Sequence, residues 1–218
     1  MEDKKKNYKI VSPEIPKKLE VVQSSDHDIE NDDFFELSLI SDCCIENQTA
    51  ENVNFKQVIF RNVIFKQIVF KGLDLTDVRF ENCDLSNVDF NEAIIHKVEM
   101  INCKMLGIDL SESALQNVKF ENCNGSYASF AFSHCKQVNF ENCLLRNADF
   151  QDSKFNKVVF FESDLQQVEM SGTKLKEIDL SDCEIEGMNV RTTDLYGVIV
   201  SPIQAVSLSR LLGLVIKS

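Results

Sequence analysis

Apolar residues recur at every fifth position through most of this chain. Thirty positions of this series fall between residues 55 and 200, and only Gly125 and Cys135 among them are not large apolar residues. A second column lies two positions before each member of the first and holds mostly small or β-branched side chains. The two columns contain no Asp, Glu, Lys, Arg, His, Asn or Gln, although about sixteen charges would fall there by chance at the overall 27%. The five-residue period is therefore a structural signal.

This spacing excludes both standard secondary structures as the repeating unit. An α-helix buries positions 3.6 residues apart, and a β-strand buries every second residue. A repeat of five residues with two inward positions describes a short extended piece followed by a turn. A closed coil of such pieces pairs with the next coil through parallel strands. Asp, Asn, Ser and Gly crowd the other three columns, as is typical of turn corners. The pattern predicts an all-β solenoid with its apolar columns inside.

Two runs carry a resemblance to a known family, DLSNVDF at residues 84–90 and NADFQ at residues 147–151. They resemble the A(D/N)LXX pattern of the pentapeptide-repeat family, and the same register continues over about residues 35–200. The resemblance implies a right-handed quadrilateral β-helix in which four pentapeptides complete one coil. Residues 53–200 then form about 7.5 coils, and at roughly 4.8 Å per coil the rod is about 36 Å long.

One inward column of the twenty-residue period is rich in cysteine, which permits two interpretations: a metal or redox ladder, or a stack of small reduced thiols packed as hydrophobes. Cβ atoms stacked at about 4.8 Å are too far apart for disulfides, which prefer about 3.8 Å. Neither a His nor a CxxC motif completes a zinc site. We therefore favour packed thiols and expect no metal and no cofactor. The cysteine column is Cys43, Cys83, Cys103, Cys123, Cys143 and Cys183, and an expected hydrogen-bond ladder beside it is Asn62, Asn82, Asn102, Asn122 and Asn142.

Residues 1–34 are expected to form an arm and an acidic connector that pack on the first coil. The outward positions of that coil hold Ile59, Ile64 and Val69, where the pattern usually has polar residues. Because three apolar groups on separate faces need cover, residues 8–22 are predicted to fold back over this coil or its end. Such an arm would also cap an open strand edge. The same coil carries a basic collar, which consists of Lys56, Arg61, Lys66 and Lys71.

The sequence of residues 201–218 predicts a structure that caps the end of the repeat rod. Ser201 and Pro202 supply an N-cap and a first-turn proline. Residues 203–212 then predict a helix that Gly213 ends, and residues 214–216 predict a short strand. This tail resembles the one through which Qnr- and MfpA-type quinolone-resistance proteins pair into dimers, and the alternative is a plain monomer cap. The resemblance implies a homodimer through Ala205, Leu208, Leu211, Leu212, Leu214 and Ile216.

Composition narrows the class of protein. A hydrophobic content of 44% with sixteen Phe is enough to bury a core, which excludes a disordered chain. The formal net charge of −12 excludes direct nucleic-acid binding, because neutralising phosphates needs a surplus of Lys and Arg. Apolar runs stay well below the roughly 18–20 residues of a membrane helix, and the start of the chain lacks the apolar stretch of a secretory signal. We expect a cytoplasmic protein that does not bind membranes.

Outward acidic residues stack along one edge of the predicted rod. This acidic edge is either a solvated face or a surface that imitates a DNA backbone. Duplex DNA carries one charge per about 1.7 Å, hence about 18 charges over the roughly 31 Å of residues 72–200. That segment has 22 acidic and 11 basic residues, so its net charge of −11 reaches about 0.6 of the density of DNA. The acidic edge consists of Asp89, Asp109, Asp149 and Glu169, with Glu92, Glu112 and Asp152 alongside.

The sequence offers no catalytic constellation. Its three histidines have no evident nucleophile to activate. The carboxylates occupy wet outer columns without a hydrophobic pocket that would raise a pKa. A sidewall filled by side chains also leaves no cleft for a substrate. We therefore expect a protein that is not an enzyme.

Two functions remain. The first is a scaffold that binds a protein partner through its rigid outer surface. The second, implied by the Qnr resemblance, is an acidic DNA mimic that binds DNA gyrase or topoisomerase IV and protects it from quinolones. The fold alone cannot choose between them. A continuous negative stripe would favour the mimic, and a compact apolar patch would favour the protein-binding scaffold. The outward apolar candidates are Ile101, Leu106, Tyr127, Phe132, Leu144 and Phe161.

Overall fold

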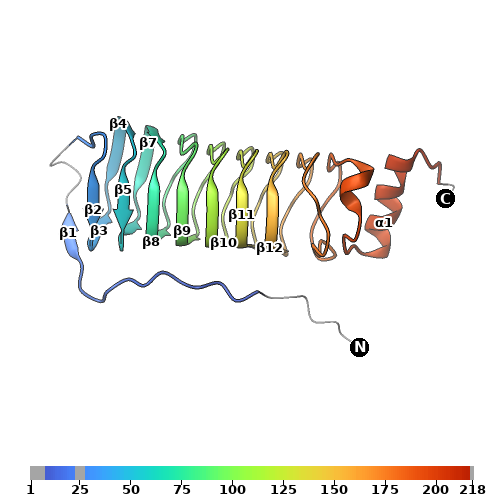
Figure 1. Cartoon of the computed structure of the whole chain (residues 1–218), viewed down its shortest axis with the longest axis horizontal. Coiled ribbons are helices and arrows are strands. Elements are labelled where there is room, and N and C mark those ends of the chain that lie inside the picture. The colour runs from blue at the N-terminus through green and yellow to red at the C-terminus, as the bar shows by residue number, and fades with distance from the viewer. Residues whose placement is uncertain (1–7, 23–27, 217–218) are drawn as a thin grey trace.

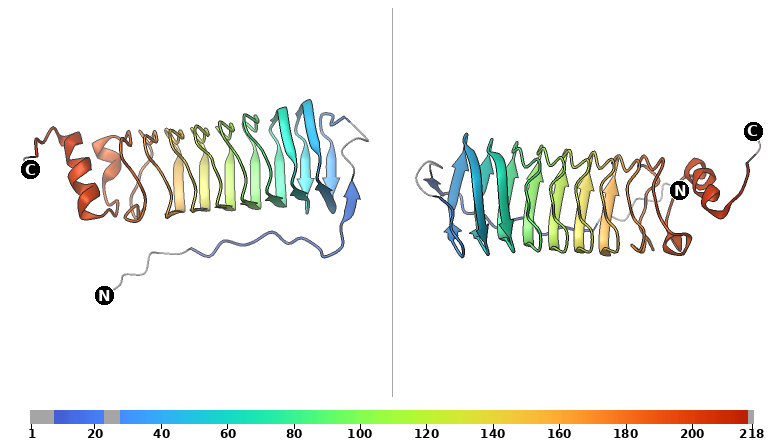
Figure 2. Two further views of the ribbon diagram at one scale, coloured as in Figure 1. Left: turned by 180° about the vertical axis from the view of Figure 1, so that it is seen from behind. Right: turned by 90° about the horizontal axis from the view of Figure 1, so that it is seen from above.

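The computed structural model describes residues 8–22 and 28–216. The chain coils into one straight rod in which each turn lies directly on the turn before it (Figure 1). A short helix closes the C-terminal end, and an extended N-terminal arm runs along one side of the rod (Figure 1, Figure 2). Residues 1–7 and 23–27 of the predicted arm and connector lie outside the described residues.

The strands of the rod pair in parallel with a register of twenty residues. Ala114, for example, pairs with Ile94 on one side and with His134 on the other. This register confirms the predicted all-β quadrilateral β-helix. The strands are β2 (Phe34–Glu36), β3 (Ser38–Ser41), β4 (Cys44–Glu51), β5 (Asn54–Lys56), β6 (Ile59–Arg61), β7 (Ile64–Lys71), β8 (Asp74–Glu81), β9 (Ile94–Ile101), β10 (Ala114–Glu121), β11 (His134–Glu141) and β12 (Lys154–Phe161).

Four pentapeptides per coil give the rod four faces, which we label A to D. At intervals of twenty residues, face A is centred on positions 55, 75 and 95, face B on 60, 80 and 100, face C on 65, 85 and 105, and face D on 70, 90 and 110. The residues on either side of each centre point outward. The corner to the next face lies two residues after the centre, so the A/B corner includes positions 57, 77 and 97.

Both inward columns fill the interior of the rod. From residue 53 to residue 190 every inward residue is buried except Phe155, which is half-buried. Phenylalanine rings stack along the axis, so that the centroid of Phe140 lies 4.8 Å from that of Phe120 and 5.0 Å from that of Phe160. The inward orientation predicted from the five-residue period is thereby confirmed.

The corners explain the polar columns. All thirty corner residues between positions 32 and 177 have a φ between 44° and 85°, and seventeen of them are Asn, Asp or Gly. These residue types adopt the left-handed conformation at least cost. One corner also forms the predicted amide ladder from Asn62 to Asn122, although Asn142, the fifth predicted member, is not bonded to it. Its bonds run from Asn82 Nδ2 to Asn62 Oδ1 (3.3 Å), from Asn102 Nδ2 to Asn82 Oδ1 (3.3 Å) and from Asn122 Nδ2 to Asn102 Oδ1 (3.2 Å).

The C-terminal end contains η1 (Thr192–Leu195), α1 (Pro202–Ser209) and η2 (Arg210–Leu212). A capping box between Ser201 and Gln204 begins α1, and Gly213, with a φ of 74°, ends η2. The predicted helix is confirmed. The predicted strand at residues 214–216 is wrong, because this segment has no strand conformation. A strand needs a neighbour to bond its backbone groups, and the described chain offers none at this position.

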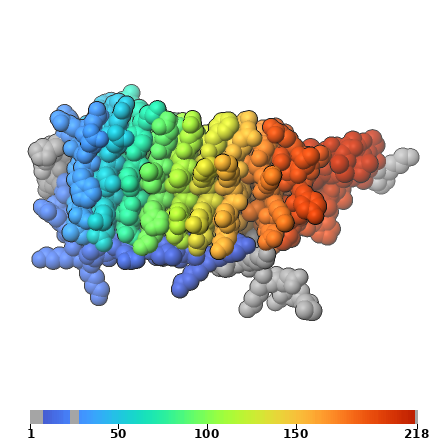
Figure 3. Space-filling view, viewed as in Figure 1, coloured from blue at the N-terminus to red at the C-terminus, as the bar shows by residue number. Residues whose placement is uncertain are grey.

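The N-terminal segment caps the open strand edge as predicted, but it does not cover the apolar residues of the first coil as predicted. β1 (Glu20–Val22) pairs in parallel with β3 and so covers the strand edge at the start of the rod. Residues 8–19, which we call the arm, then follow the A/B corner along the rod (Figure 3). The prediction that this segment covers all three apolar residues of the first coil is therefore wrong. Ile59 is half-buried near the arm, but Ile64 and Val69 are 51% and 37% exposed. A single extended segment cannot cover side chains on faces B, C and D at once.

Candidate protein-binding surfaces

The acidic edge lies on face D and on the D/A corner. Bridges join Asp89 to Asp109, and Ser129 to Asp149 and onward to Glu169, so the predicted column is stacked. Each carboxylate accepts a hydrogen bond from the backbone N–H two residues later, as Asp109 does from Ser111 at 2.8 Å. These groups therefore close the turns of the coil, a role that is independent of any partner.

Glu169 illustrates the electrostatics of this column. Burial raises the pKa of its carboxyl, but hydrogen bonds from Ser171 and Asn189 outweigh burial and hold the pKa below its usual value. Glu169 is consequently ionised at neutral pH and hydrogen-bonded within the rod. Its carboxylate is negatively charged, but its oxygens already accept hydrogen bonds from neighbouring groups.

The corner part of the acidic edge is interrupted. Glu92, Glu112 and Asp152 share the D/A corner, but Phe132, 54% exposed, stands between Glu112 and Asp152. Ser129 breaks the column on face D in the same coil. The structure therefore divides the acidic edge into two groups and does not form one continuous stripe from them.

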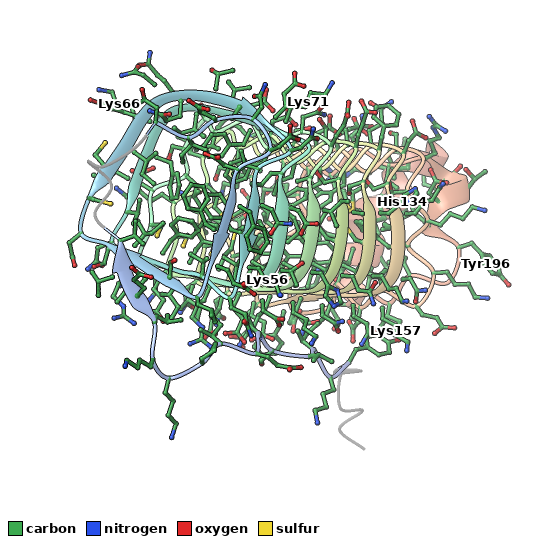
Figure 4. All side chains as sticks on the ribbon, turned by 60° about the vertical axis from the view of Figure 1, so that its left-hand side comes forward. Lys56, Lys66, Lys71, His134, Lys157 and Tyr196 are labelled. Carbon is green, nitrogen blue, oxygen red and sulfur yellow. The ribbon has the colours of Figure 1, made fainter. Side chains whose placement is uncertain are left out.

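The basic collar is neutralised by pairing between neighbouring coils. Each of its four cations lies within ion-pair distance of a carboxylate on an adjacent coil, and three of its lysines are labelled in Figure 4. Exposed pairs of this kind contribute about 0–1 kcal/mol each, so the collar is not a free positive surface. The pairs are Lys56–Glu36 (2.8 Å), Arg61–Glu81 (2.6 Å), Lys66–Glu46 (3.3 Å) and Lys71–Glu92 (2.9 Å).

Face A carries a basic surface that our sequence analysis missed. From residue 94 to residue 176 its outward positions contain no acidic residue. Four exposed lysines there have no ion-pair partner within the described ranges. Counting charges by face rather than by segment would have found this surface. It consists of Lys136, Lys154, Lys174 and Lys176. His134, labelled in Figure 4, is an outward residue of the same face.

Three of the six outward apolar candidates lie on one side of the rod. Leu106, Tyr127 and Leu144 lie on face C and its corner with face D in three successive coils, and all are exposed. Tyr127 is 64% exposed, and the corner residue one coil before it is Gly107. We call Leu106, Tyr127 and Leu144 the apolar patch. Ile101, Phe132 and Phe161 lie on other faces and are not part of it.

The C-terminal segment, residues 196–216, exposes a second apolar surface. A groove of about 570 Å³ between η1 and α1 is lined by the dimer candidates Ala205, Leu208 and Leu212. Leu211, Leu214 and Ile216 are exposed beyond it. The large hydrophobic side chains that stay exposed in this segment are Tyr196, Ile199, Ile203, Val206, Leu211, Leu212, Leu214, Val215 and Ile216.

The cysteine column is a packing feature. Its members from Cys83 onward are buried, all eight cysteines are free, and Cys103 Sγ donates to the backbone oxygen of Phe80 at 3.6 Å. Elsewhere in the core, burial raises the pKa of the Cys135 thiol to about 12. A buried thiol that keeps its proton, as Cys135 does, is a poor nucleophile and a poor ligand. Among the described residues no group of three His, Cys, Asp or Glu side chains could hold a metal ion, and none of the helices is long and apolar enough to cross a membrane.

Two family models match this chain. The model described as pentapeptide repeat region matches residues 73–148 and 133–208, and the model described as pentapeptide repeats (8 copies) matches residues 51–87. The chain belongs to the pentapeptide-repeat family. Pentapeptide-repeat proteins are generally non-catalytic structural or binding proteins. A comparison with curated proteins finds no significant match.

Solved pentapeptide-repeat structures are similar to this chain at low sequence identity. HetL, involved in heterocyst differentiation regulation in the cyanobacterium Nostoc sp. strain PCC 7120, is 12% identical, with 78% of this chain and 87% of that chain covered and a TM-score of 0.47. Trypsin-treated QnrB1, a plasmid-mediated fluoroquinolone resistance protein, is 21% identical, with coverages of 91% and 98% and a TM-score of 0.43. These likenesses concern the repeat fold and not the function.

Proposed function

We propose that this pentapeptide-repeat protein is a non-catalytic binding module that engages a protein partner through its outer surface. The apolar patch is the observation that carries the proposal. Its three side chains project from a wall whose inner side is filled with packed residues, so the backbone that carries them is held in place. Aromatic and aliphatic anchors on a rigid surface are typical of the centre of protein interfaces. Little ordering entropy is lost when such a surface binds.

The competing proposal is a DNA mimic that binds DNA gyrase or topoisomerase IV and protects it from quinolones. The acidic edge of Asp89, Glu92, Asp109, Glu112, Asp149, Asp152 and Glu169 would then contact the enzyme. This proposal has weaker support. The edge is divided in two, its face D carboxylates are hydrogen-bonded within the rod, and face A is basic. A DNA backbone instead presents regularly spaced negative charge.

Two matched variants distinguish these proposals. Leu106→Glu combined with Tyr127→Ala alters the apolar patch, and Glu92→Gln combined with Glu112→Gln removes charge from the acidic edge. We expect the patch variant to weaken binding of a purified partner, isolated from the source organism, at least tenfold by calorimetry. The edge variant should stay within threefold of wild type. Supercoiling by purified gyrase, with and without ciprofloxacin, should not change at micromolar protein.

The opposite pattern would contradict the proposal. If the protein altered gyrase activity or drug sensitivity and the edge variant lost that effect, the DNA mimic would be the correct function. Equal partner binding by wild type and by the patch variant would likewise reject the apolar patch as the contact surface.

We also propose that the C-terminal segment forms a homodimer. Nine large hydrophobic side chains stay exposed between residues 196 and 216, and clusters of exposed apolar side chains often mark interaction sites. Leu212→Glu places a charge in the groove between η1 and α1, so the dimer dissociation constant should rise at least tenfold in analytical ultracentrifugation. Leu106→Glu, which adds the same charge on face C, is the control and should leave the dimer intact. A wild-type protein that sediments as a monomer at every concentration would refute the dimer.

A further inference from the structure

The arm contacts six successive corner residues on the A/B corner. Four of these contacts are hydrogen bonds to main-chain groups of the arm, and two are charge contacts with its side chains. They are Gln57 Nε2 to the backbone oxygen of Glu14 (2.8 Å), the Glu14 N–H to Asp77 Oδ1 (2.9 Å), Lys97 Nζ to Glu14 Oε1 (2.7 Å), the Val11 N–H to Asn117 Oδ1 (3.3 Å), Gln137 Nε2 to the backbone oxygen of Lys9 (3.3 Å), and Lys157 Nζ at 6.0 Å from the ring centre of Tyr8.

Burial sets this corner apart from the other three. Asp77 and Asn117 are buried under the arm, whereas no corner residue that the structure describes on the other three corners is buried. Beside them on face B, the outward residues Glu99 and Asn139 are also buried. Asn139 Oδ1 is buried without a hydrogen-bond partner. The A/B corner from residue 57 to residue 157, which we call the arm track, is therefore a surface shaped for an extended segment.

The chemistry of the arm track defines what it binds. Amide and carboxylate side chains bond the main-chain groups of Lys9, Val11 and Glu14, which any extended segment would offer. Two contacts depend on side chains. Lys97 binds a carboxylate, and this hydrogen bond and charge lower the pKa of Glu14 and raise the pKa of Lys97. Lys157 faces an aromatic ring. The track thus recognises an extended segment with an aromatic residue six positions before an acidic one.

The arm can leave the track without disturbing the rod. Within residues 8–22, β1 is the part that pairs with the sheet, and residues 8–19 form no strand. Between Pro13 and Leu19 the arm stands away from face B, over an open space of about 500 Å³ that is also lined by Ile59, Arg61 and Arg79. Pro13 and Pro16 lack an N–H and keep their predecessors extended. A segment held by separate contacts opens locally more often than a packed core does.

We propose that the arm track binds an extended segment of a partner protein with an aromatic residue six positions before an acidic one, and that the arm is a built-in competitor for this site. The free arm is tethered beside the track at high effective concentration, so a partner segment must displace it. The arm therefore occupies the track until a partner segment binds the track more tightly than the arm does. The arm track is separate from the apolar patch, so either proposal can fail while the other holds.

A full-length variant with an opened arm tests the proposal. Ile10→Asp combined with Ile15→Asp replaces two half-buried arm residues and should release the arm. A fluorescein-labelled peptide with the sequence of residues 8–19 serves as the probe in fluorescence anisotropy. We expect it to bind the opened chain at least tenfold more tightly than wild type, because wild type is already occupied. Circular dichroism should show the same β content in both chains.

Further variants identify the bound surface. Lys97→Glu in the opened chain should weaken the peptide at least tenfold, and a peptide carrying Glu14→Lys should restore binding to that chain. Asn122→Ala, on the B/C corner, is the matched control and should have no effect. In wild type, hydrogen exchange should show that the Val11 and Glu14 amides open far more often than those of β9 and β10.

Three results would overturn the proposal. The peptide could fail to bind the opened chain, or it could bind wild type, the opened chain and the Lys97→Glu chain equally. Alternatively, wild type could form dimers that disappear with the two arm substitutions but persist with Leu212→Glu. In that case a second copy of this chain, and not a partner protein, would occupy the arm track.

Discussion

Replacing Phe140 by alanine will lower the free energy of unfolding by about 3–5 kcal/mol. Phe140 is fully buried, stacks on Phe120 and Phe160, and meets Phe130 and Phe150 edge-on. Truncation removes a ring from a column in which each coil contacts only the coils next to it. The backbone of adjacent coils is held by parallel hydrogen bonds, so the walls cannot collapse inward to fill the space. Urea unfolding monitored by circular dichroism measures the loss.

Phe132→Ala is the matched control. Phe132 lies in the preceding coil but occupies a corner and is 54% exposed, so the same change should alter stability by less than about 0.5 kcal/mol. If the two variants lost equal stability, the assignment of inward and outward columns would be wrong.

The interior could be predicted from the sequence because its period leaves no alternative. Side chains at multiples of five are uniformly apolar, and any shift of register would put charges inside. Even Gly125 follows the rule: Leu145 Cδ2 lies 3.0 Å from the point that a Cβ on Gly125 would occupy, so a neighbour takes up the space. The corner composition followed equally well from turn chemistry.

The outer surface could be predicted only in part. The columns of acidic residues were placed correctly, but the sequence did not show that Asp109 and Asp149 bond the backbone of their own turns. Those bonds supply a structural reason for acidic residues at these positions. The basic surface of face A was not predicted because its lysines come from three separate coils, and acidic residues on the other faces lie between them in the sequence.

The two ends could not be derived from the repeat. Apolar residues such as Ile64 suggested a cover, but exposed apolar side chains are common on protein surfaces. The path of the arm depends on contacts between Glu14 and corner residues such as Asp77, which are far away in sequence and which the repeat pattern does not mark as contact sites. The tail from Leu214 to Ile216 lacks a strand because strand formation depends on a neighbouring chain segment, which sequence pattern does not reveal.

Gln204 joins α1 to the end of the rod, and its replacement should release the helix. The side chain is buried, and its Nε2 donates to the backbone oxygens of Leu180 and Cys183, each at 2.7 Å. Its Oε1 accepts the N–H of Ser201 at 2.7 Å within the capping box. An eight-residue helix is not stable alone in water. Gln204 is thus a main polar attachment of α1 to the last coils.

Gln204→Ala leaves the backbone oxygen of Cys183 without a donor, which costs about 1–3 kcal/mol in local stability, whereas the backbone oxygen of Leu180 still accepts the N–H of Cys183 at 2.9 Å. The exchange protection of the α1 amides should therefore fall roughly 5- to 150-fold in hydrogen–deuterium exchange. The amides of β9 to β11 should keep their protection, since coils far from the end make no contact with α1. Ser201→Ala removes only the cap oxygen, so it should cost about 1 kcal/mol and lower the protection of the α1 amides less than Gln204→Ala does. Unchanged α1 protection in Gln204→Ala would show that apolar contacts alone, such as those of Leu208, hold the helix on the rod.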